Sequence, residues 1–159
     1  MAIVRPGDLY HLGVVVDDVM TAAHEISEVT GARWTRPIEF EQWMRFGGTD
    51  REIEFVAMYS LDAPHYELIQ AIPGTPLGNV TRENAVHHVG YWANDFHADI
   101  ARLRELGFTE EVLGLDEHLQ PWGFAYFLTP GGRRIEIADR SAFEPTWDGF
   151  LLAHAQGKT

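Results

Sequence analysis

The sequence predicts an α+β fold in which one β-α-β-β-β module occurs twice in tandem. Three observations predict it: an internal repeat, the same order of strand and helix patterns in each copy, and a turn-rich segment between the copies. Residues 10–31 (YHLGVVVDDVMTAAHEISEVTG) align with residues 87–107 (HHVGYWANDFHADIARLRELG). The alignment matches three pairs at a spacing of 77 positions: His11 with His88, Gly13 with Gly90, and Asp18 with Asp95. Such a repeat dictates the architecture, because each copy folds as the same supersecondary unit.

Within each copy, a strand of six or seven residues precedes an amphipathic helix. Asp18 and Asp95 stand at the position of a helix N-cap, and Gly31 and Gly107 follow the helical pattern as stop residues. Three strand-like runs come after each helix, at about residues 33–40, 52–60 and 65–71 in the first copy and 109–115, 123–129 and 133–139 in the second. Residues 41–51 (EQWMRFGGTDR) are expected to form a glycine-containing loop.

We expect a single domain over residues 1–159, because independent domains usually have ~100 residues or more. Residues 72–85 are rich in Pro, Gly and Asn, which is typical of a linker between the copies. The expected parts are module one at about 8–71, this linker, module two at about 86–140, and a C-terminal helical segment at about 141–159.

The composition excludes several classes of protein. A net charge of −12 repels phosphate backbones and anionic membranes, so we expect neither a nucleic-acid nor a membrane partner. No apolar run approaches the ~20 residues that a membrane span requires. The N-terminal residues lack the pattern of a signal peptide, so a cytoplasmic location is expected. The chain has no cysteine, which leaves nitrogen and oxygen donors for any metal.

Four polar residues occupy matched positions on the predicted strands. His11 and His88 lie on the first strand of each module, and Glu67 and Glu136 lie on the last. Any one of them alone reads as a solvated or hydrogen-bonded strand residue. However, a pseudo-twofold arrangement of the modules would bring all four toward one axis. Two imidazoles and two carboxylates suit an octahedral or five-coordinate divalent metal, with one or two positions left for water or substrate.

The motifs YHLGVVVDD, HHVGYWAND, ELIQAIPGTP and FAYFLTPGGRRIEIAD resemble the vicinal oxygen chelate superfamily, which includes glyoxalase I, extradiol dioxygenases and bleomycin-resistance proteins. The resemblance covers about residues 8–140 and is strongest to the glyoxalase-like branch that contains methylmalonyl-CoA epimerase. It implies a cupped, incomplete mixed β-barrel with flanking helices, and a homodimer. It also implies one divalent metal ion (Zn, Ni, Co, Mn or Fe) held by His11, Glu67, His88 and Glu136.

This ligand set predicts a metal-dependent isomerase, epimerase or lyase that polarises a substrate carbonyl and moves a proton at the adjacent carbon. Glu54 aligns with the glutamate that epimerases of the family place on the third strand, and Glu136 can leave the metal to accept a proton. Glu54 can instead be a solvated edge-strand charge, together with Glu52. Two other functions stay open: an iron-dependent extradiol-type dioxygenase, and a non-catalytic binding or resistance protein.

The tryptophans and His87, the histidine next to His88, are the last residues for which the sequence gives an expectation. Four tryptophans fall on or near strands that would line the cup, which indicates a bulky, partly apolar small-molecule substrate unless they fill the core: Trp34, Trp43, Trp92 and Trp122. Trp92 shares the face of His88 by alternation and is expected to form a pocket wall. His87 should point to the opposite, outer face, where it packs or meets solvent.

Overall fold

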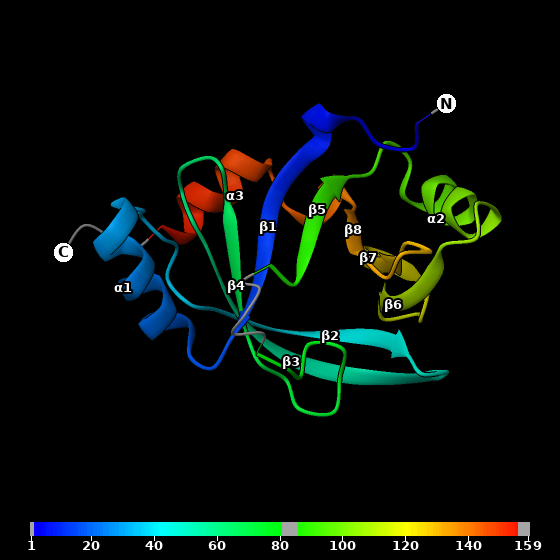
Figure 1. The fold of residues 1–159 in the computed structure, drawn as a ribbon, viewed down its shortest axis with the longest axis horizontal. Helices are drawn as coiled ribbons and strands as arrows, with labels where there is room; N and C mark the ends of the chain where they lie inside the picture. Colours follow the sequence, from blue (N-terminus) through cyan, green and yellow to red (C-terminus); the bar gives the residue numbers. More distant parts are fainter. Residues whose placement is uncertain (1, 81–85, 156–159) are drawn as a thin grey trace.

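The computed structural model describes residues 2–80 and 86–155, and places eight strands and three α-helices (Figure 1). The first half contains β1 (Leu9–Val16), α1 (Val19–Thr30), β2 (Ile38–Phe46), β3 (Thr49–Tyr59) and β4 (Tyr66–Gln70). The second half contains β5 (His88–Trp92), α2 (Phe96–Glu105), β6 (Thr109–Leu115), β7 (Pro121–Leu128) and β8 (Arg134–Ala138). Short 3-10 turns, η1 (Pro6–Asp8) and η2 (Arg140–Ala142), flank these halves, and α3 (Trp147–His154) follows.

Both long helices begin at the aspartates that the repeat aligned. The Asp18 carboxylate accepts a hydrogen bond from the Thr21 backbone N–H at 2.7 Å, and that of Asp95 accepts one from Ala98 N–H at 3.0 Å. Gly31 caps the C-terminus of α1 in the left-handed conformation, which a residue without a Cβ adopts at little cost. The predicted caps are therefore confirmed.

The eight strands form one closed sheet in the order β1-β4-β3-β2-β6-β7-β8-β5. Each half contributes four neighbouring strands in the same order of pairing, with β1 parallel to β4 and β5 parallel to β8. The halves join through antiparallel pairs at two seams, β1 with β5 and β2 with β6. The expected incomplete barrel is wrong in this respect, because the pairing of β2 with β6 at Trp43–Arg45 closes the ring.

The first of the predicted strand runs is misplaced. The structure has β2 at Ile38–Phe46 rather than at 33–40, and the expected loop 41–51 is the tip of a long β2–β3 hairpin. Gly47 and Gly48 form its two-residue turn with φ of 57° and 77°, the positive values that a type I′ turn requires. Arg45 pairs with Asp50 across the hairpin through two short hydrogen bonds. The glycine pair marks a turn inside a hairpin and not the centre of an irregular loop.

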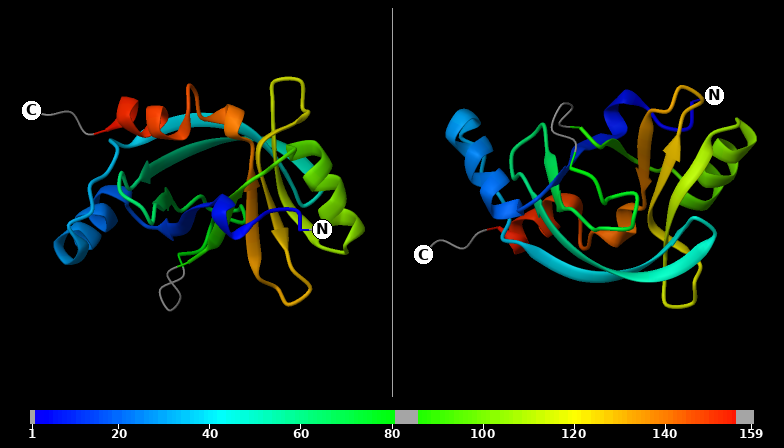
Figure 2. Two further views of the ribbon diagram at one scale, coloured as in Figure 1. Left: turned by 90° about the horizontal axis from the view of Figure 1, so that it is seen from above. Right: turned by 60° about the horizontal axis from the view of Figure 1, so that its bottom comes forward.

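The helices pack on the outer face of the sheet, and side chains from the strands fill the interior of the barrel. Figure 2 shows α1 and α2 on the outside of the sheet at opposite sides of the molecule, and α3 beside the curved β2–β3 hairpin. On the α1 side, Leu68 packs with Val19 and Ala23, and on the α2 side Ile137 packs with Ile100 and Leu103. One face of β4 and β8 is therefore used for helix packing, so their alternate residues point into the barrel.

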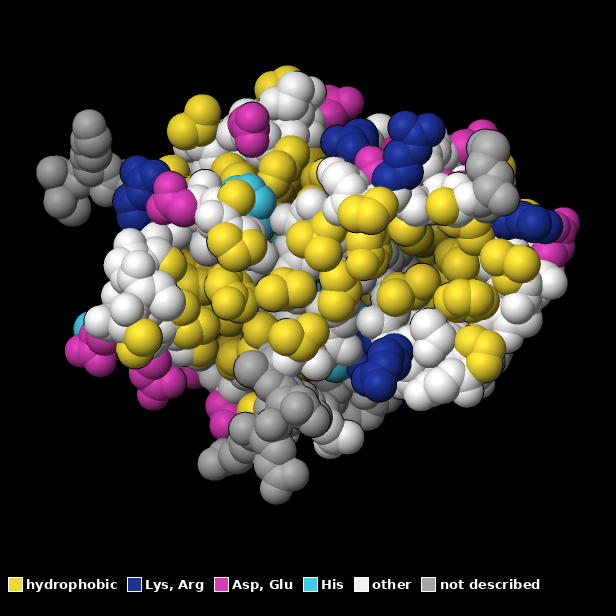
Figure 3. All heavy atoms as spheres, turned by 45° about the horizontal axis from the view of Figure 1, so that its top comes forward, with side chains coloured by type: hydrophobic (Ala, Val, Ile, Leu, Met, Phe, Trp, Pro, Cys, Tyr) yellow, Lys and Arg dark blue, Asp and Glu magenta, His cyan; other side chains and the backbone are white. Residues whose placement is uncertain are grey.

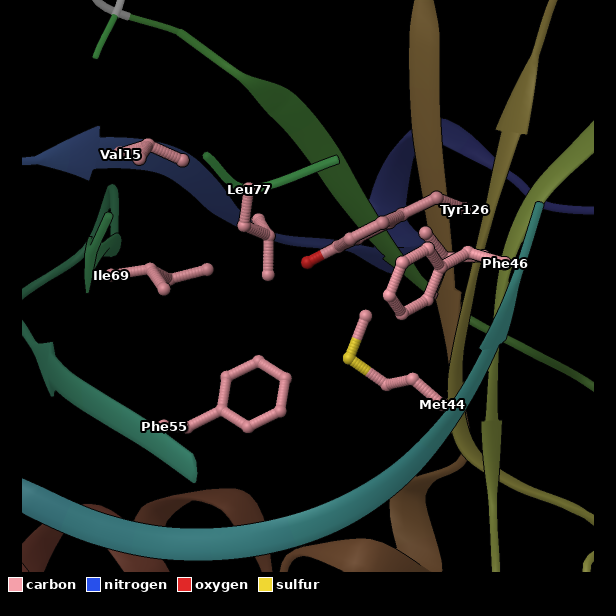
Figure 4. Packing of buried hydrophobic residues seen from close by; sticks show 8 residues of the cluster. Val15, Met44, Phe46, Phe55, Ile69, Leu77 and Tyr126 are labelled. Atoms are coloured by element: carbon pink, nitrogen blue, oxygen red, sulfur yellow. The ribbon is translucent and has the colours of Figure 1, made fainter. Parts of the chain in front are cut away.

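The segment between the two halves contributes to the interior. Leu77 is fully buried in the barrel with Val15, Met44, Phe55 and Tyr126 (Figure 4). A hydrogen bond from Ile72 N–H to Leu77 C=O, at 3.0 Å, joins the two ends of the loop 72–77. The first part of the expected linker thus plugs one end of the barrel, whereas residues 81–85 lie outside the described residues.

Replacing Leu77 with alanine is expected to lower the free energy of unfolding by about 2–5 kcal/mol, because the rigid barrel wall cannot collapse into the cavity. Urea denaturation followed by circular dichroism measures the change. Leu152→Ala is the matched control, since Leu152 is 75% exposed, and its loss of stability should be small. Equal effects of the two substitutions would show that Leu77 carries no packing energy.

The surface has a broad apolar face, visible as the yellow area of Figure 3. Along β1 and β5 the outward-facing side chains of Leu12, Val89 and Tyr91 are only half-buried, and Leu9 is 40% exposed. Within residues 2–80 and 86–155, no helix is both long and apolar enough to cross a bilayer. The homodimer expected above stays a prediction.

Candidate metal centre

The structure brings together the four residues that the repeat matched. His11 on β1, Glu67 on β4, His88 on β5 and Glu136 on β8 each direct one ligand atom to a common point, and these atoms lie within 4.8 Å of one another. All four side chains are buried. The register explains the convergence: Gly13 pairs with Glu67 in the first half, and Gly90 pairs with Glu136 at the same place in the second.

Two glycines make room for the histidine rings. A Cβ placed on Gly13 would lie 1.9 Å from Cε1 of His88, and one on Gly90 would lie 2.7 Å from Cε1 of His11. At the β1–β5 seam, His11 pairs with Gly90 and His88 pairs with Gly13, so each ring lies over the other half's glycine. The spacing His-x-Gly in both copies therefore has a steric reason that the alignment alone did not show.

The spacing of the ligand atoms fits a single cation. His88 Nε2 lies 2.8 Å from Oε2 of Glu136 and 3.3 Å from Oε2 of Glu67. His11 Nε2 lies 3.2 Å from Oε2 of Glu67, 3.4 Å from Oε2 of Glu136, and 2.8 Å from His88 Nε2. Ligand atoms held at ~2.1 Å from one cation and roughly at right angles are about 3 Å apart. Among the described residues, Glu67 Oε2 is buried without a hydrogen-bond partner although two imidazole nitrogens face it, so the donor set fits a divalent metal.

The remaining oxygen of each carboxylate is held by a tyrosine. The Tyr10 hydroxyl donates to Oε1 of Glu136 at 2.6 Å, and the Tyr59 hydroxyl donates to Oε1 of Glu67. Each carboxylate is therefore oriented with one oxygen toward the histidines. Groups that hold metal ligands in this way fix their direction and tune their basicity.

Electrostatics favour ionised carboxylates facing protonated imidazoles in the metal-free site. Burial alone would lower the pKa of His11, but the Glu67 and Glu136 carboxylates outweigh it and raise that pKa to about 10. Burial opposes ionisation of Glu136, yet His11 and His88 lower its pKa to about 2, and Glu67 is shifted in the same direction. Burial beside the two carboxylates raises the pKa of Tyr10 and of Tyr59 well above 10. The carboxylates keep the imidazoles protonated in the metal-free protein. A metal that binds the imidazoles would displace these protons.

Metal binding is therefore expected to release protons and to tighten as the pH rises from 6.5 toward 10. The pKa of His11 is raised from 6.5 to about 10. Protonated His11 therefore stabilises the metal-free protein fully below pH 6.5, and this stabilisation is lost as the pH rises through 10. Calorimetric titrations with zinc in buffers of different ionisation enthalpy measure the protons released. Affinity that is constant over this range, with no proton release, would contradict the prediction.

A cavity of about 290 Å³ opens onto the two carboxylates. Glu67, Glu136 and three tyrosines form its polar end, with Tyr126 as the third tyrosine. Half of the other lining residues are aromatic: Phe40, Phe55, Trp122, Phe124, Phe143 and Phe150. Phe143 and Phe150 come from the C-terminal segment, so this segment contributes to the wall of the cavity.

Glu54 is not part of the cavity wall. It lies exposed on β3 opposite Glu41 on β2, and the alternation of β3 sends Phe55 and Tyr59 into the barrel and Glu54 out of it. The lining of the cavity therefore gives no support to Glu54 as a base, and that role stays a prediction. Glu136 does line the cavity, as a catalytic residue requires.

Only one of the four tryptophans lines the cavity. Trp122 does so at its mouth and is 40% exposed. Trp92, the expected wall, is buried behind Tyr10, on which it stacks at 3.7 Å between ring centroids. Trp34 is buried beneath α1, and half-buried Trp43 packs against the core on the α2 side of the sheet.

His87 does not turn to the outer surface. It precedes the first residue of β5, so the alternation of a strand does not apply to it. Its ring lies half-buried beside His88, with the two Nδ1 atoms 3.0 Å apart. Burial, together with the charges of His88 and Arg134, lowers its pKa to about 4, so that it is neutral at physiological pH.

The tyrosines were missed by the reasoning from sequence. Tyr10 reaches the interior beside His11 because the register of β1 with β5 shifts between Leu9 and His11, a β-bulge that the sequence pattern does not reveal. Tyr59 could have been found, since it continues the inward series Phe55–Ala57 on β3. Tyr126 likewise alternates with Phe124 on β7, and both line the cavity.

Comparisons with known proteins agree with the fold. The family model described as "Glyoxalase/Bleomycin resistance protein/Dioxygenase superfamily" matches residues 10–126, which is most of the chain. The chain therefore belongs to this superfamily, whose members are also known as vicinal oxygen chelate proteins. No curated protein matches the sequence.

Solved structures of low sequence identity share the fold. Methylmalonyl-CoA epimerase from Mycobacterium tuberculosis is 15% identical with a TM-score of 0.56, and the match covers 87% of this chain and 89% of that chain. A variant of the Streptomyces coelicolor epimerase, in complex with 2-nitronate-propionyl-CoA, is 14% identical with a TM-score of 0.57, covering 87% and 98%. A hypothetical protein from Bacillus halodurans is 12% identical with a TM-score of 0.56, covering 82% and 92%.

Proposed function

We propose that the protein is a divalent-metal-dependent enzyme that moves a proton at a carbon next to a carbonyl group, as an isomerase, epimerase or lyase. One observation carries the proposal: Glu67 and Glu136 belong both to the four-residue cluster and to the wall of the aromatic cavity. A substrate in the cavity therefore meets the proposed metal site at its polar end. The match to the superfamily and the epimerase-like fold support this assignment.

The bound cation would supply a Lewis acid that polarises the substrate carbonyl and stabilises negative charge on its oxygen. Glu136 is the proposed proton acceptor. Its Oε1 is held by Tyr10, whose ring is fixed by stacking on Trp92, while Oε2 is the oxygen directed at the histidines. An ionised carboxylate held on the cavity wall can accept a proton from a carbon positioned beside it.

The lining of the cavity favours an uncharged, partly apolar carbonyl compound. Aromatic rings from four strands and the C-terminal segment form most of the wall, and none of the described residues that line it is Lys or Arg. An anionic group placed within the cavity would meet Glu67 and Glu136 without a cationic side chain in the described lining to balance it. Phe and Trp side chains supply the area that holds the carbon skeleton.

Exchange of the substrate hydrogen next to the carbonyl for deuterium tests the proposed function. The protein, loaded with zinc, cobalt, nickel or manganese, is incubated in D₂O with a panel of α-hydroxy and aryl carbonyl compounds, and proton NMR follows the signal of the carbon next to the carbonyl. We expect metal-dependent exchange that Glu136→Gln removes and Glu54→Gln leaves unchanged. Loss of exchange in Glu54→Gln alone would assign the base to Glu54 instead.

The same panel separates the competing functions. Oxygen uptake by the iron-loaded protein, without exchange, would favour a dioxygenase. Saturable binding with neither exchange nor oxygen uptake would favour a binding or resistance protein. Each of these outcomes would overturn the proposed proton transfer.

A further inference from the structure

His87 is held at each of its polar atoms. Its backbone N–H donates to Gly13 C=O at 2.7 Å, and its carbonyl accepts from Nη1 of Arg134 at 3.2 Å. In the ring, Nε2 lies 3.0 Å from Pro76 C=O, and Nδ1 lies 3.0 Å from Nδ1 of His88. These four contacts fix both the position and the direction of the imidazole.

The contacts from Pro76 through the His87 ring to the His88 ring allow only one placement of the ring hydrogens when His88 binds a metal. Pro76 C=O can only accept, so Nε2 of His87 carries a hydrogen and its Nδ1 offers a lone pair. Nδ1 of His88 must then be the donor in the contact between the two rings. The lone pair of His88 is left on Nε2, the atom that lies 2.8 Å from Glu136 Oε2 and faces the cluster.

We propose that His87 is a positioning residue that holds His88 in the tautomer and orientation required to bind the metal through Nε2. This inference rests on the metal site of the proposed function. A histidine that binds a metal usually donates its other ring N–H to a carboxylate, carbonyl or water. Here the acceptor is a second imidazole, which is itself fixed by the carbonyl of Pro76.

The residue that precedes the histidine of the cluster has a different role in each half of the molecule. Tyr10 holds the place in the first half that His87 holds in the second, and its hydroxyl supports Glu136 rather than a histidine. Within the described part of the chain, Nδ1 of His11 is buried without a hydrogen-bond partner. The support is therefore specific to His88, and it connects the site to the segment that carries the buried Leu77.

Two substitutions separate the hydrogen bond from packing. His87→Asn keeps an acceptor, because Oδ1 takes the place of Nδ1, whereas His87→Leu keeps bulk and removes the acceptor. Neither variant retains the contact with Pro76. We expect His87→Leu to weaken the binding of Co²⁺ about 10–100-fold, as loss of such a partner typically does, and His87→Asn to stay close to the unchanged protein. Thermal unfolding of the metal-free variants reports on the fold.

A second measurement needs no substitution. In zinc-loaded protein labelled with ¹⁵N in histidine, a scalar coupling across the hydrogen bond should connect Nδ1 of His87 with Nδ1 of His88. Wild-type affinity in His87→Leu, equal weakening in both variants, or absence of the coupling would each overturn the proposal. Failure of the unchanged protein to bind zinc or cobalt would instead overturn the proposed function, and this inference with it.

Discussion

Replacing His88 with alanine is expected to abolish binding of a divalent metal at the site. The imidazole is one of the two nitrogen ligands of the proposed metal centre, and its Nε2 lies 2.8 Å from Glu136 Oε2. The loss should exceed the ~10–100-fold that removal of a supporting partner costs, because a ligand itself disappears. Titration with Co²⁺, followed by its visible absorption, measures the affinity.

His97→Ala is the control for His88→Ala, because His97 lies exposed on α2, away from the cluster. It should bind Co²⁺ like the unchanged protein. Circular dichroism of both metal-free variants shows whether the fold survives. A folded His88→Ala variant that still binds one Co²⁺ with unchanged affinity would show that His88 is not a ligand.

Replacing Gly13 with alanine is expected to remove metal binding although no ligand is changed. The new Cβ would lie 1.9 to 2.4 Å from three atoms of the His88 ring, closer than real Cβ contacts occur. The ring must turn away from the cluster, or β1 and β5 must separate. Overpacking of this kind costs about 1–3 kcal/mol of stability. Urea denaturation and Co²⁺ titration measure the two effects.

Gly7→Ala is the matched control for Gly13→Ala, because a Cβ at Gly7 meets nothing within 4 Å. It should leave both stability and Co²⁺ affinity almost unchanged. The companion substitution Gly90→Ala acts on His11, where the clash is milder at 2.7 Å. If Gly13→Ala binds Co²⁺ normally, the close approach of His88 to Gly13 does not exist in solution.

Much of the fold could be predicted because the same local signals occur twice. The aspartate caps and glycine stops define α1 and α2, and the order of strands and helices follows from the repeat. The β2–β3 hairpin was misplaced because the Gly47–Gly48 pair is compatible with a loop as well as with the type I′ turn that its positive φ values form. The burial of Leu77 and the closure of the barrel depend on contacts distant in sequence.

The convergence of the two histidines and two glutamates follows from their matched positions, since each glutamate pairs with the glycine of its own half. The supporting residues were not predictable in the same way. Tyr10 depends on a bulge, and His87 lies just before β5, where alternation no longer applies. Glu54 is a different case: the resemblance proposed it as a base at the site, whereas the pleat of β3 turns it outward, as the alternative of a solvated strand charge expects.

X-ray absorption spectroscopy of the zinc-loaded protein, together with a count of zinc ions per chain, tests whether the two histidines and two glutamates hold a metal. We predict one zinc per chain, with the scattering of two imidazoles and with oxygen ligands from Glu67 and Glu136. The double variant Glu67→Gln with Glu136→Gln should bind no zinc at this site. A spectrum with no imidazole scattering, or full zinc binding by the double variant, would contradict the assignment of the metal centre.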